Sequence, residues 1–228
     1  MTRRLLLPAL MLVLAAALPA QNATHWGDPS LPAITYDVFW EAATPQAYTI
    51  TVQPTGKAKY MSRNPTKPPD SNGPQDEDYE LEFKMSPASS EKIFALARQA
   101  GYFNGDFDYK KHAVASTGKK TLSYADADHH FHTTYNWSEN SAIDQLTRLF
   151  GGISNTIENG RRLQFLRRFD KLGLEAALKG MEEMTQNENL AEIQIIAPLL
   201  ENIANDSSVL NIARARARRL LAKQANSK

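Results

Sequence analysis

The histidines near residue 130 are the residues whose type and spacing best suit chemistry. His130 and His132 stand two apart in a stretch that alternates like a β-strand, so both imidazoles project from one face. Imidazole is a common ligand of zinc and copper, and a carboxylate from Asp126 or Asp128 can complete the shell of the metal; His112 lies upstream. The pattern therefore allows a metal-binding protein, or a metal-assisted hydrolase, that uses His130 and His132.

The same histidines also fit the wet face of a hairpin whose other face holds Tyr124 and Phe131. No clear third ligand stands at a fixed spacing from His130 and His132, with His129 in the turn beside them, and the sequence contains no His-Glu-x-x-His element. We therefore favour solvated histidines, expect no metal-ligating residue, and keep metal binding as the alternative function.

The sequence lacks the other residue patterns that organise catalysis. It contains no cysteine, no Gly-x-Ser-x-Gly nucleophile turn and no glycine-rich phosphate loop. The carboxylate pairs Glu80/Glu82 and Asp106/Asp108 have the chemistry for acid–base work, but they fall on the polar face of a predicted strand and in a loop. We expect these carboxylates to be solvated charges, and we expect no catalytic residue and no cofactor.

Basic residues near the C-terminus offer a nucleic-acid hypothesis that the spacing does not favour. The four arginines concerned are Arg214, Arg216, Arg218 and Arg219. At helical spacing they spread over more than one face, which is typical of a solvated basic surface at a helix end. The 26 basic and 25 acidic residues of the chain nearly balance, so the net charge predicts no polyanionic partner either. We expect no nucleic acid partner.

Three tryptophans could contribute to a recognition surface. Trp40 fits a core strand, and Trp137 precedes a helix cap against which it can pack. Trp26 lies in an N-terminal leader that contains glycine and prolines. Trp26 is therefore the tryptophan that we expect to be free for binding.

The first twenty residues have the pattern of a secretory signal peptide. Arg3 and Arg4 precede an apolar run over 5–18, and Pro19 and Ala20 are followed by polar residues. We expect cleavage near Ala20, with an uncleaved N-terminal anchor as the alternative. The remaining chain is predicted to be periplasmic or secreted and to have no membrane span. Because it has no cysteine, packing must hold it together without disulfides.

The elements that must position these side chains belong to a predicted α+β domain over residues 21–160. Residues 79–85 alternate with period two, which indicates a strand with one buried face. Residues 87–100 continue with a helical stripe that Ser86 caps and Gly101 ends. This strand and helix are predicted to form the centre of the core.

Two hairpins and one further strand complete the predicted antiparallel sheet. A Pro54-Thr55-Gly56 loop closes the first hairpin and a turn at Ala127-Asp128 closes the second. The predicted pairs are Val52 with Ala58, Ile50 with Tyr60 and Thr51 with Lys59 in the first, and Tyr124 with Phe131, Leu122 with Thr133, Ser123 with His132 and Ala125 with His130 in the second. Phe39 interrupts the polar face of a strand over 34–40, which predicts a strand covered on both sides.

A second helix is predicted to begin at a Ser141 cap and to end at Asn159-Gly160. Residues 62–78 are rich in proline and polar residues and indicate a long loop. The tail over 161–228 has three apolar helical stripes and is predicted to be a helical C-terminal subdomain, in which Pro198 divides the middle helix. The fold class is thus α+β: an antiparallel sheet of hairpins packed by two main helices, followed by a small helical segment.

Two parts of the chain resemble known kinds of protein. Tyr48-x-Ile50-x-Val52, Gly56, Tyr60, Ile93-x-x-Leu96 and Phe103 resemble an uncharacterised family of exported bacterial α+β domains, over residues 34–158. Residues 199–221 are similar to a HEAT-type helix–turn–helix unit through the Asn205-Asp206 turn and the Ala213/Ala217 spacing. The resemblance implies an exported α+β fold and carries over no activity and no site residue.

These observations predict an exported, non-enzymatic binding or interaction protein. A well-formed core without a catalytic constellation favours binding over turnover. We expect the partner to be another envelope or extracellular protein, contacted through the sheet or the helical tail. Self-association through the tail is a third hypothesis.

Overall fold

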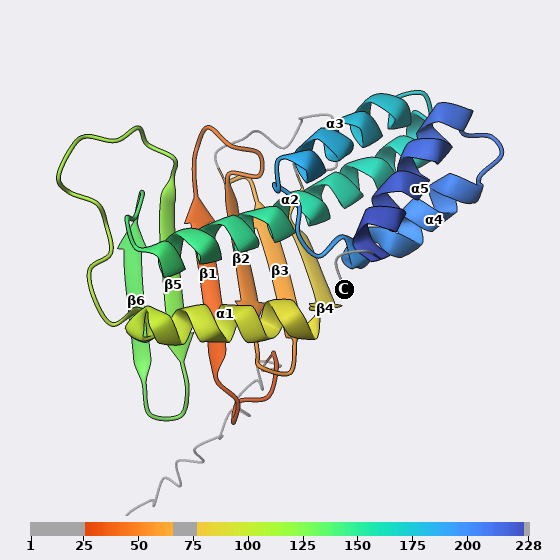
Figure 1. Cartoon of the computed structure of the whole chain (residues 1–228). Coiled ribbons are helices and arrows are strands. Elements are labelled where there is room, and N and C mark those ends of the chain that lie inside the picture. The colour runs from red at the N-terminus through yellow and green to blue at the C-terminus, as the bar shows by residue number, and fades with distance from the viewer. Residues whose placement is uncertain (1–25, 66–76, 226–228) are drawn as a thin grey trace, which may run out of the picture.

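The computed structural model describes residues 26–65 and 77–225. The expected signal peptide over 1–20 and most of the predicted loop over 62–78 lie outside the described residues. The described chain forms an α+β fold in which a six-stranded antiparallel sheet is packed by helices on one face (Figure 1). The strands, in the spatial order β4-β3-β2-β1-β5-β6, are β1 Ala33–Phe39, β2 Ala47–Val52, β3 Lys57–Arg63, β4 Tyr79–Lys84, β5 Lys119–Ala125 and β6 His130–Tyr135. The predicted fold class is confirmed.

Both predicted hairpins form with the predicted registers. In the first, Val52 pairs with Ala58 and Ile50 with Tyr60, around a loop whose Gly56 has φ +79°. A Cβ at Gly56 would lie 2.9 Å from the Met85 carbonyl oxygen, so both the backbone angle and the close strand require glycine. Every pair predicted for the second hairpin is also present between β5 and β6.

Helix α1 spans Pro87–Gln99 and has the predicted ends. Ser86 is the N-cap, and its side chain accepts a hydrogen bond from the backbone N–H of Ser89. Pro87 occupies the first turn, where a missing N–H costs no helical hydrogen bond. Gly101 follows with φ +57° and leads into the short helix η2, Gly101–Phe103.

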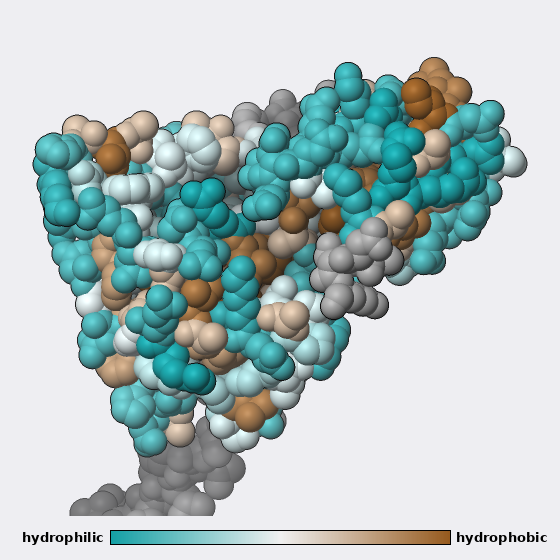
Figure 2. Space-filling model, viewed as in Figure 1, coloured by the Kyte–Doolittle hydropathy of each residue, from teal (hydrophilic) through white to brown (hydrophobic). Residues whose placement is uncertain are grey.

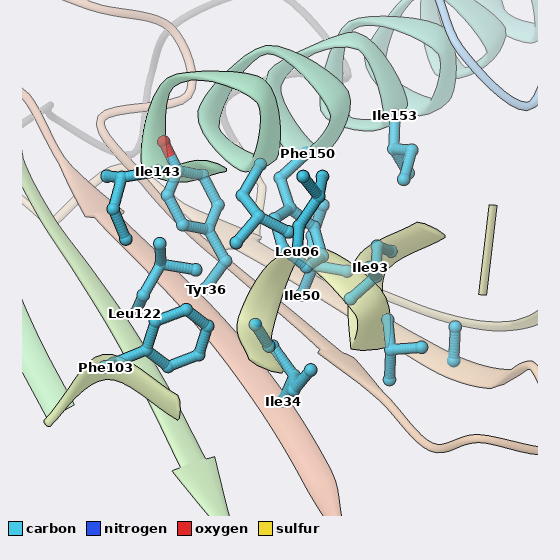
Figure 3. Packing of buried hydrophobic residues seen from close by; sticks show 14 of the residues in the cluster. Ile34, Tyr36, Ile50, Ile93, Leu96, Phe103, Leu122, Ile143, Phe150 and Ile153 are labelled. Carbon is cyan, nitrogen blue, oxygen red and sulfur yellow. The ribbon is translucent and has the colours of Figure 1, made fainter. Parts of the chain in front are cut away.

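The main core lies between the sheet and the helices α1 and α2, and α2 spans Ser141–Phe169. Figure 3 shows apolar side chains from the sheet meeting those of the two helices. Those labelled and fully buried include Ile34, Tyr36, Ile50, Leu122, Ile93, Phe103, Ile143, Phe150 and Ile153. These side chains come from elements far apart in the sequence, so the core ties both ends of the domain together.

The strand over 79–84, predicted to form the centre of the core with the helix that follows it, lies at an edge of the sheet. As β4 it pairs with β3 on one side, and it is last in the strand order. Its alternation is as predicted, but Leu81 and Phe83 are half-buried, whereas Met85 just beyond it is buried. Alternation reveals which face of a strand is covered and contains no information about its neighbours.

Helix α2 is 29 residues long and continues through the predicted end at Asn159-Gly160. A Cβ at Gly160 would lie 2.5 Å from Ile196 Cγ2, so this glycine permits close packing inside a helix instead of ending one. The predicted boundary between residues 160 and 161 therefore falls within α2. The N-cap is also one residue earlier than predicted, because Asn140 accepts hydrogen bonds from the N–H groups of Ala142 and Ile143.

The C-terminal helices pack on the end of α2 and form a helical unit, defined as residues 174–225. Its elements are α3 Leu174–Gln186, η3 Ile193–Ile196, α4 Ala197–Asn205 and α5 Asn211–Ala225. They share a second core with Leu163 of α2, and the unit extends past the β4 edge of the sheet (Figure 1). Pro198 stands in the first turn of α4, which confirms that it divides the chain there. Leu210, just before α5, is 45% exposed.

One carboxylate joins the helical unit to α1. Glu192, with φ +55°, accepts hydrogen bonds from the Ser86 N–H and hydroxyl, both at 2.7 Å, and from the Ser89 hydroxyl at 2.6 Å. A negative charge at a helix N-terminus also interacts favourably with the helix dipole. Glu192 therefore fixes the start of α1 against the segment that enters η3.

Candidate functional site

The histidines lie at the β5–β6 turn, and their side chains are exposed. His129, His130 and His132 face solvent, as the hairpin interpretation expects. His129 Nδ1 is 3.1 Å from Asp126 Oδ1. The backbone N–H of Asp128 and the Tyr124 hydroxyl donate to the Asp126 carboxylate, and with the His129 N–H they lower its pKa to about 2. Asp126 thus organises the turn.

The structure gives the metal hypothesis no further ligand. Within residues 26–65 and 77–225, no group of three or more histidine, aspartate or glutamate side chains is arranged to hold a metal ion. His112 is exposed in the loop before β5, where its ring centre is 6.2 Å from that of Tyr109. Metal binding by His130 and His132 stays a prediction, which metal analysis of the purified protein can test.

The paired carboxylates have local partners. Glu80 Oε1 lies 2.7 Å from Lys59 Nζ, and Asp106 contacts Lys110, four residues further along the same loop. Asp108 Oδ1 accepts the backbone N–H of Asn136 at 2.9 Å and so fixes the loop before β5. These groups organise the surface, and their geometry does not direct them at a common reacting atom.

The C-terminal arginines contact other helices of the helical unit. Arg216 lies between Glu175 and Glu182 of α3, and Arg219 Nε is 2.7 Å from Glu182 Oε1. Arg218 donates to the backbone carbonyl of Ala204 at 2.8 Å. The sequence did not reveal these pairs, because the partners are 14 to 41 residues apart along the chain.

The tryptophans differ from their predicted placement. Trp26, expected to be free, is half-buried, and Lys57 Nζ lies 5.5 Å from the centre of its ring. Trp40, expected in the core, follows the end of β1 and is 40% exposed. Trp137 is 43% exposed and packs edge-on against Tyr109, with ring centres 4.7 Å apart. The prediction for Trp40 is wrong because it extended the strand to Trp40, whereas β1 ends one residue earlier, at Phe39.

A buried polar cluster joins α2 to β3 and was missed by sequence reasoning. Glu158 Oε1 accepts the hydroxyls of Tyr60 at 2.8 Å and Ser62 at 2.7 Å, and its Oε2 is 3.1 Å from Arg161 Nη1. The Glu158 and Arg161 side chains are each 7% exposed. Burial and the neighbouring Glu158 charge raise the pKa of Tyr60 above its ordinary value. An i,i+3 acid–base pair within an apolar helix is the sequence signal that points to this cluster.

In the described residues, no helix covers the second face of the sheet: α1 and α2 lie across the first face, and the helical unit extends past the β4 edge (Figure 1). The strand registers arrange its side chains in rows that cross the strands. One row contains Met61, Thr49, Asp37 and Thr121, and the next contains Arg63, Ala47, Phe39 and Lys119. Threonines dominate the centre, where the Thr49 hydroxyl donates to Asp37 Oδ1 at 2.6 Å.

A hollow of about 730 Å³ lies at the end of this face, where β1 finishes and β5 starts. We name it the sheet hollow and define it by Asp37, Phe39, Met61, Arg63 and Lys119, which line it with neighbours from β2 and β4. Phe39 is 44% and Met61 is 43% exposed. The volume falls within the range of ligand sites, about 300–1,000 Å³. Apolar area between charges of both signs suits it to hold a ligand.

Phe39 is the residue of the sheet hollow whose position looked unusual in the sequence. Its position on a polar face predicted a strand covered on both sides, and that prediction is wrong, because the side chain stands in the open hollow. An apolar residue on a polar strand face is therefore explained here by the hollow and not by a second layer.

Comparison with known proteins adds no assignment. No protein-family model matches the chain, and no curated protein matches its sequence. In the part of the chain that the structure describes, no helix is long and apolar enough to cross a membrane.

Proposed function

We propose that this chain is an exported, non-enzymatic binding protein and that the sheet hollow is its binding site. The observation that carries the proposal is a hollow of about 730 Å³ on the open sheet face, with Phe39 and Met61 exposed inside it. Exposed apolar side chains bounded by charged ones mark binding sites more often than plain surface.

The shape of the sheet hollow favours an extended ligand. Its lining comes from five adjacent strands, β4 to β5 in the spatial order. With neighbouring strands about 4.8 Å apart, the hollow crosses about 19 Å. An extended peptide rises about 3.3 Å per residue, so about six residues span it. A segment of another envelope or extracellular protein has this shape.

The charges of the hollow match the same kind of ligand. Arg63 and Lys119 stand on either side of Phe39 in one row, and Asp37 lies in the neighbouring row. A peptide with an apolar residue between two acidic ones would place its carboxylates near Arg63 and Lys119. Phe39 would then contact the apolar residue between them.

The groups beside the hollow are arranged to hold a ligand and not to transform one. Among the hydroxyls that line it, Thr49 donates to Asp37 at 2.6 Å and Ser62 donates to Glu158 at 2.7 Å. Glu158 is already engaged by Tyr60 and Arg161. A nucleophilic serine needs a neighbouring base that is free to accept its proton, and this arrangement does not offer one.

Selection from a displayed peptide library tests the proposal, with residues 21–228, which include every described residue, as the bait. Peptides selected on this chain are measured by fluorescence anisotropy against Phe39→Ser and Arg63→Ala. We expect each substitution to weaken binding about tenfold, because both remove exposed anchors. Val114→Ser is the matched control, since Val114 is 41% exposed and lies outside the sheet hollow. Selected peptides that bind both variants as well as the wild type would refute the proposed site.

A further inference from the structure

Exposed apolar side chains gather at the far end of the helical unit. Phe169 and Leu172 lie where α2 turns into α3, and they are 64% and 73% exposed. Leu210 and Ile212 lie at the start of α5 and are 45% and 51% exposed. Figure 2 shows hydrophobic residues at this outer end, at the upper right of the molecule. We name these four residues the distal tip.

Ion pairs hold the two turns of the distal tip together. Lys171 Nζ lies 3.1 Å from Asp206 Oδ2 and also contacts the Ser208 hydroxyl, so the α2–α3 turn is joined to the α4–α5 turn. Arg167 Nε is 3.9 Å from the same carboxylate. Hydrogen bonds from Ser208 and Lys171 lower the pKa of Asp206, which keeps it ionised. The exposed apolar groups therefore stand on a defined surface.

The surroundings of the distal tip are basic. Residues 165–172 and 205–214 contain four basic and two acidic side chains. Of the two acids, Asp206 faces Lys171 and Arg167, and Asp170 accepts the Gly173 N–H at 3.2 Å. The Arg168 guanidinium lies 5.0 Å from the centre of the Phe169 ring, on an exposed side chain. Apolar and positively charged groups thus project together.

We propose that the distal tip binds the surface of an anionic lipid bilayer. Protruding apolar side chains flanked by Arg and Lys match the interface of such a bilayer, where the apolar groups enter and the basic groups meet lipid phosphates. Long basic side chains reach the headgroups while their stems cover apolar surface. The tip is an end of the molecule formed by two turns, and a fluid surface can receive it without a matching groove.

A second copy of this chain fits the distal tip less well. Two copies that met there would bring like charges together, which costs free energy in a contact that excludes water. Four exposed side chains also provide less contact than a stable dimer, which buries about 800 Å² on each partner. The charge of the tip therefore favours an anionic surface over self-association.

Vesicle flotation with residues 21–228 tests the proposal. This chain omits the apolar run over 5–18, which could otherwise bind lipid itself and obscure the contribution of the distal tip. We expect binding to vesicles of phosphatidylglycerol and phosphatidylcholine in equal parts, and little binding to phosphatidylcholine alone. Raising NaCl from about 20 mM to about 500 mM should weaken the binding, because salt screens the basic groups.

Variants of the distal tip separate its contribution from general basicity. Phe169→Ser with Leu172→Ser, and separately Arg168→Gln, should each lower the partition coefficient at least about fivefold. Val114→Ser with Arg98→Gln is the matched control, since it removes an exposed apolar and a basic side chain that lie outside both the distal tip and the sheet hollow, and it should leave the coefficient unchanged. Circular dichroism verifies that each variant is folded. A wild-type chain that does not float with anionic vesicles, or tip variants that float like the wild type, would overturn the proposal.

Discussion

Glu158 and Arg161 face each other inside the protein, where an unpaired charge is costly. Tyr60 and Ser62 complete the hydrogen bonds of the carboxylate, and Arg161 lies 4.2 Å from the centre of the Tyr79 ring. A buried pair of this kind adds little over an apolar pair, but removing one partner leaves the other charged and unmatched. These contacts join α2 to β3.

We predict that Glu158→Ala lowers the free energy of unfolding by about 3 kcal/mol, because the buried Arg161 guanidinium loses its contact with the Glu158 carboxylate. The matched control is Asp144→Ala, which removes the carboxylate of a surface pair with Arg148 in the same helix. The control should cost about 0.5 kcal/mol. Urea denaturation followed by circular dichroism measures both values. Similar losses in the two variants would show that the buried pair has no special role.

We predict that the protein loses stability above about pH 10, where free tyrosine ionises. Burial raises the pKa of Tyr135 to about 12, and it raises the pKa of Tyr36 and Tyr60 as well. The unfolded chain therefore loses these protons first as pH rises. The stability is complete below pH 10 and falls by about 1.4 kcal/mol per pH unit for each such tyrosine.

Urea denaturation at several pH values between 8 and about 12 measures this dependence. Tyr135→Phe serves as the comparison, because it removes one titrating hydroxyl, which lies 2.6 Å from Thr147 Oγ1. The variant should show a shallower decline with pH than the wild type. An identical pH dependence of the free energy of unfolding in both proteins would mean that Tyr135 does not contribute to this loss of stability.

Two glycines of α2 differ in how closely other residues pack on them. Replacing each by alanine therefore separates the effect of tight packing from the effect of helix propensity. A Cβ at Gly160 would meet Ile196 Cγ2 at 2.5 Å, whereas a Cβ at Gly151 would have nothing within 4 Å. We predict that Gly151→Ala stabilises the protein by up to about 1 kcal/mol, since alanine favours the helix. Gly160→Ala should destabilise it by about 1–3 kcal/mol, since α2 and η3 must separate. Thermal melts of both variants give the sign, and a stabilising Gly160→Ala would contradict the close packing.

The elements that sequence predicted well depend on residues close together in the chain. Both hairpin registers follow from a loop and the alternation beside it, and the ends of α1 follow from Ser86 and Gly101. The errors concern contacts between distant segments. Gly160 was taken as a helix end because its neighbour Ile196 is 36 positions away, and the edge position of β4 was not predicted because alternation does not order strands.

The candidate site was less predictable than the fold for the same reason. The sheet hollow gathers side chains from five strands, and their proximity follows from the strand order. Phe39 was noticed, but its surroundings could not be read from the residues beside it. The distal tip needs the contact between Lys171 and Asp206, which joins turns 35 residues apart. Local patterns contain no trace of such pairings.

At the scale of the whole molecule, sheet and helical unit are joined by a continuous helix and by Glu192. We predict that the chain unfolds in one cooperative transition, so that near-ultraviolet signals from the core tyrosines and far-ultraviolet signals from the helices coincide. A chain that ends at Gly160 should fail to fold stably, because it loses Leu163, Ile196 and Glu192 with their contacts. Two separate unfolding transitions, or a stably folded chain that ends at Gly160, would instead support a domain boundary between residues 160 and 161.

The length of α2 has a consequence for how the protein would stand in an envelope. At 1.5 Å per residue its 29 residues form a rod of about 43 Å, which starts in front of β5 and β6 and ends at the distal tip (Figure 1). With the distal tip on lipid, as proposed, helix α2 would hold the sheet away from the lipid headgroups. A peptide bound in the sheet hollow would then lie at a fixed distance from the bilayer. A longer or shorter α2 would change that distance.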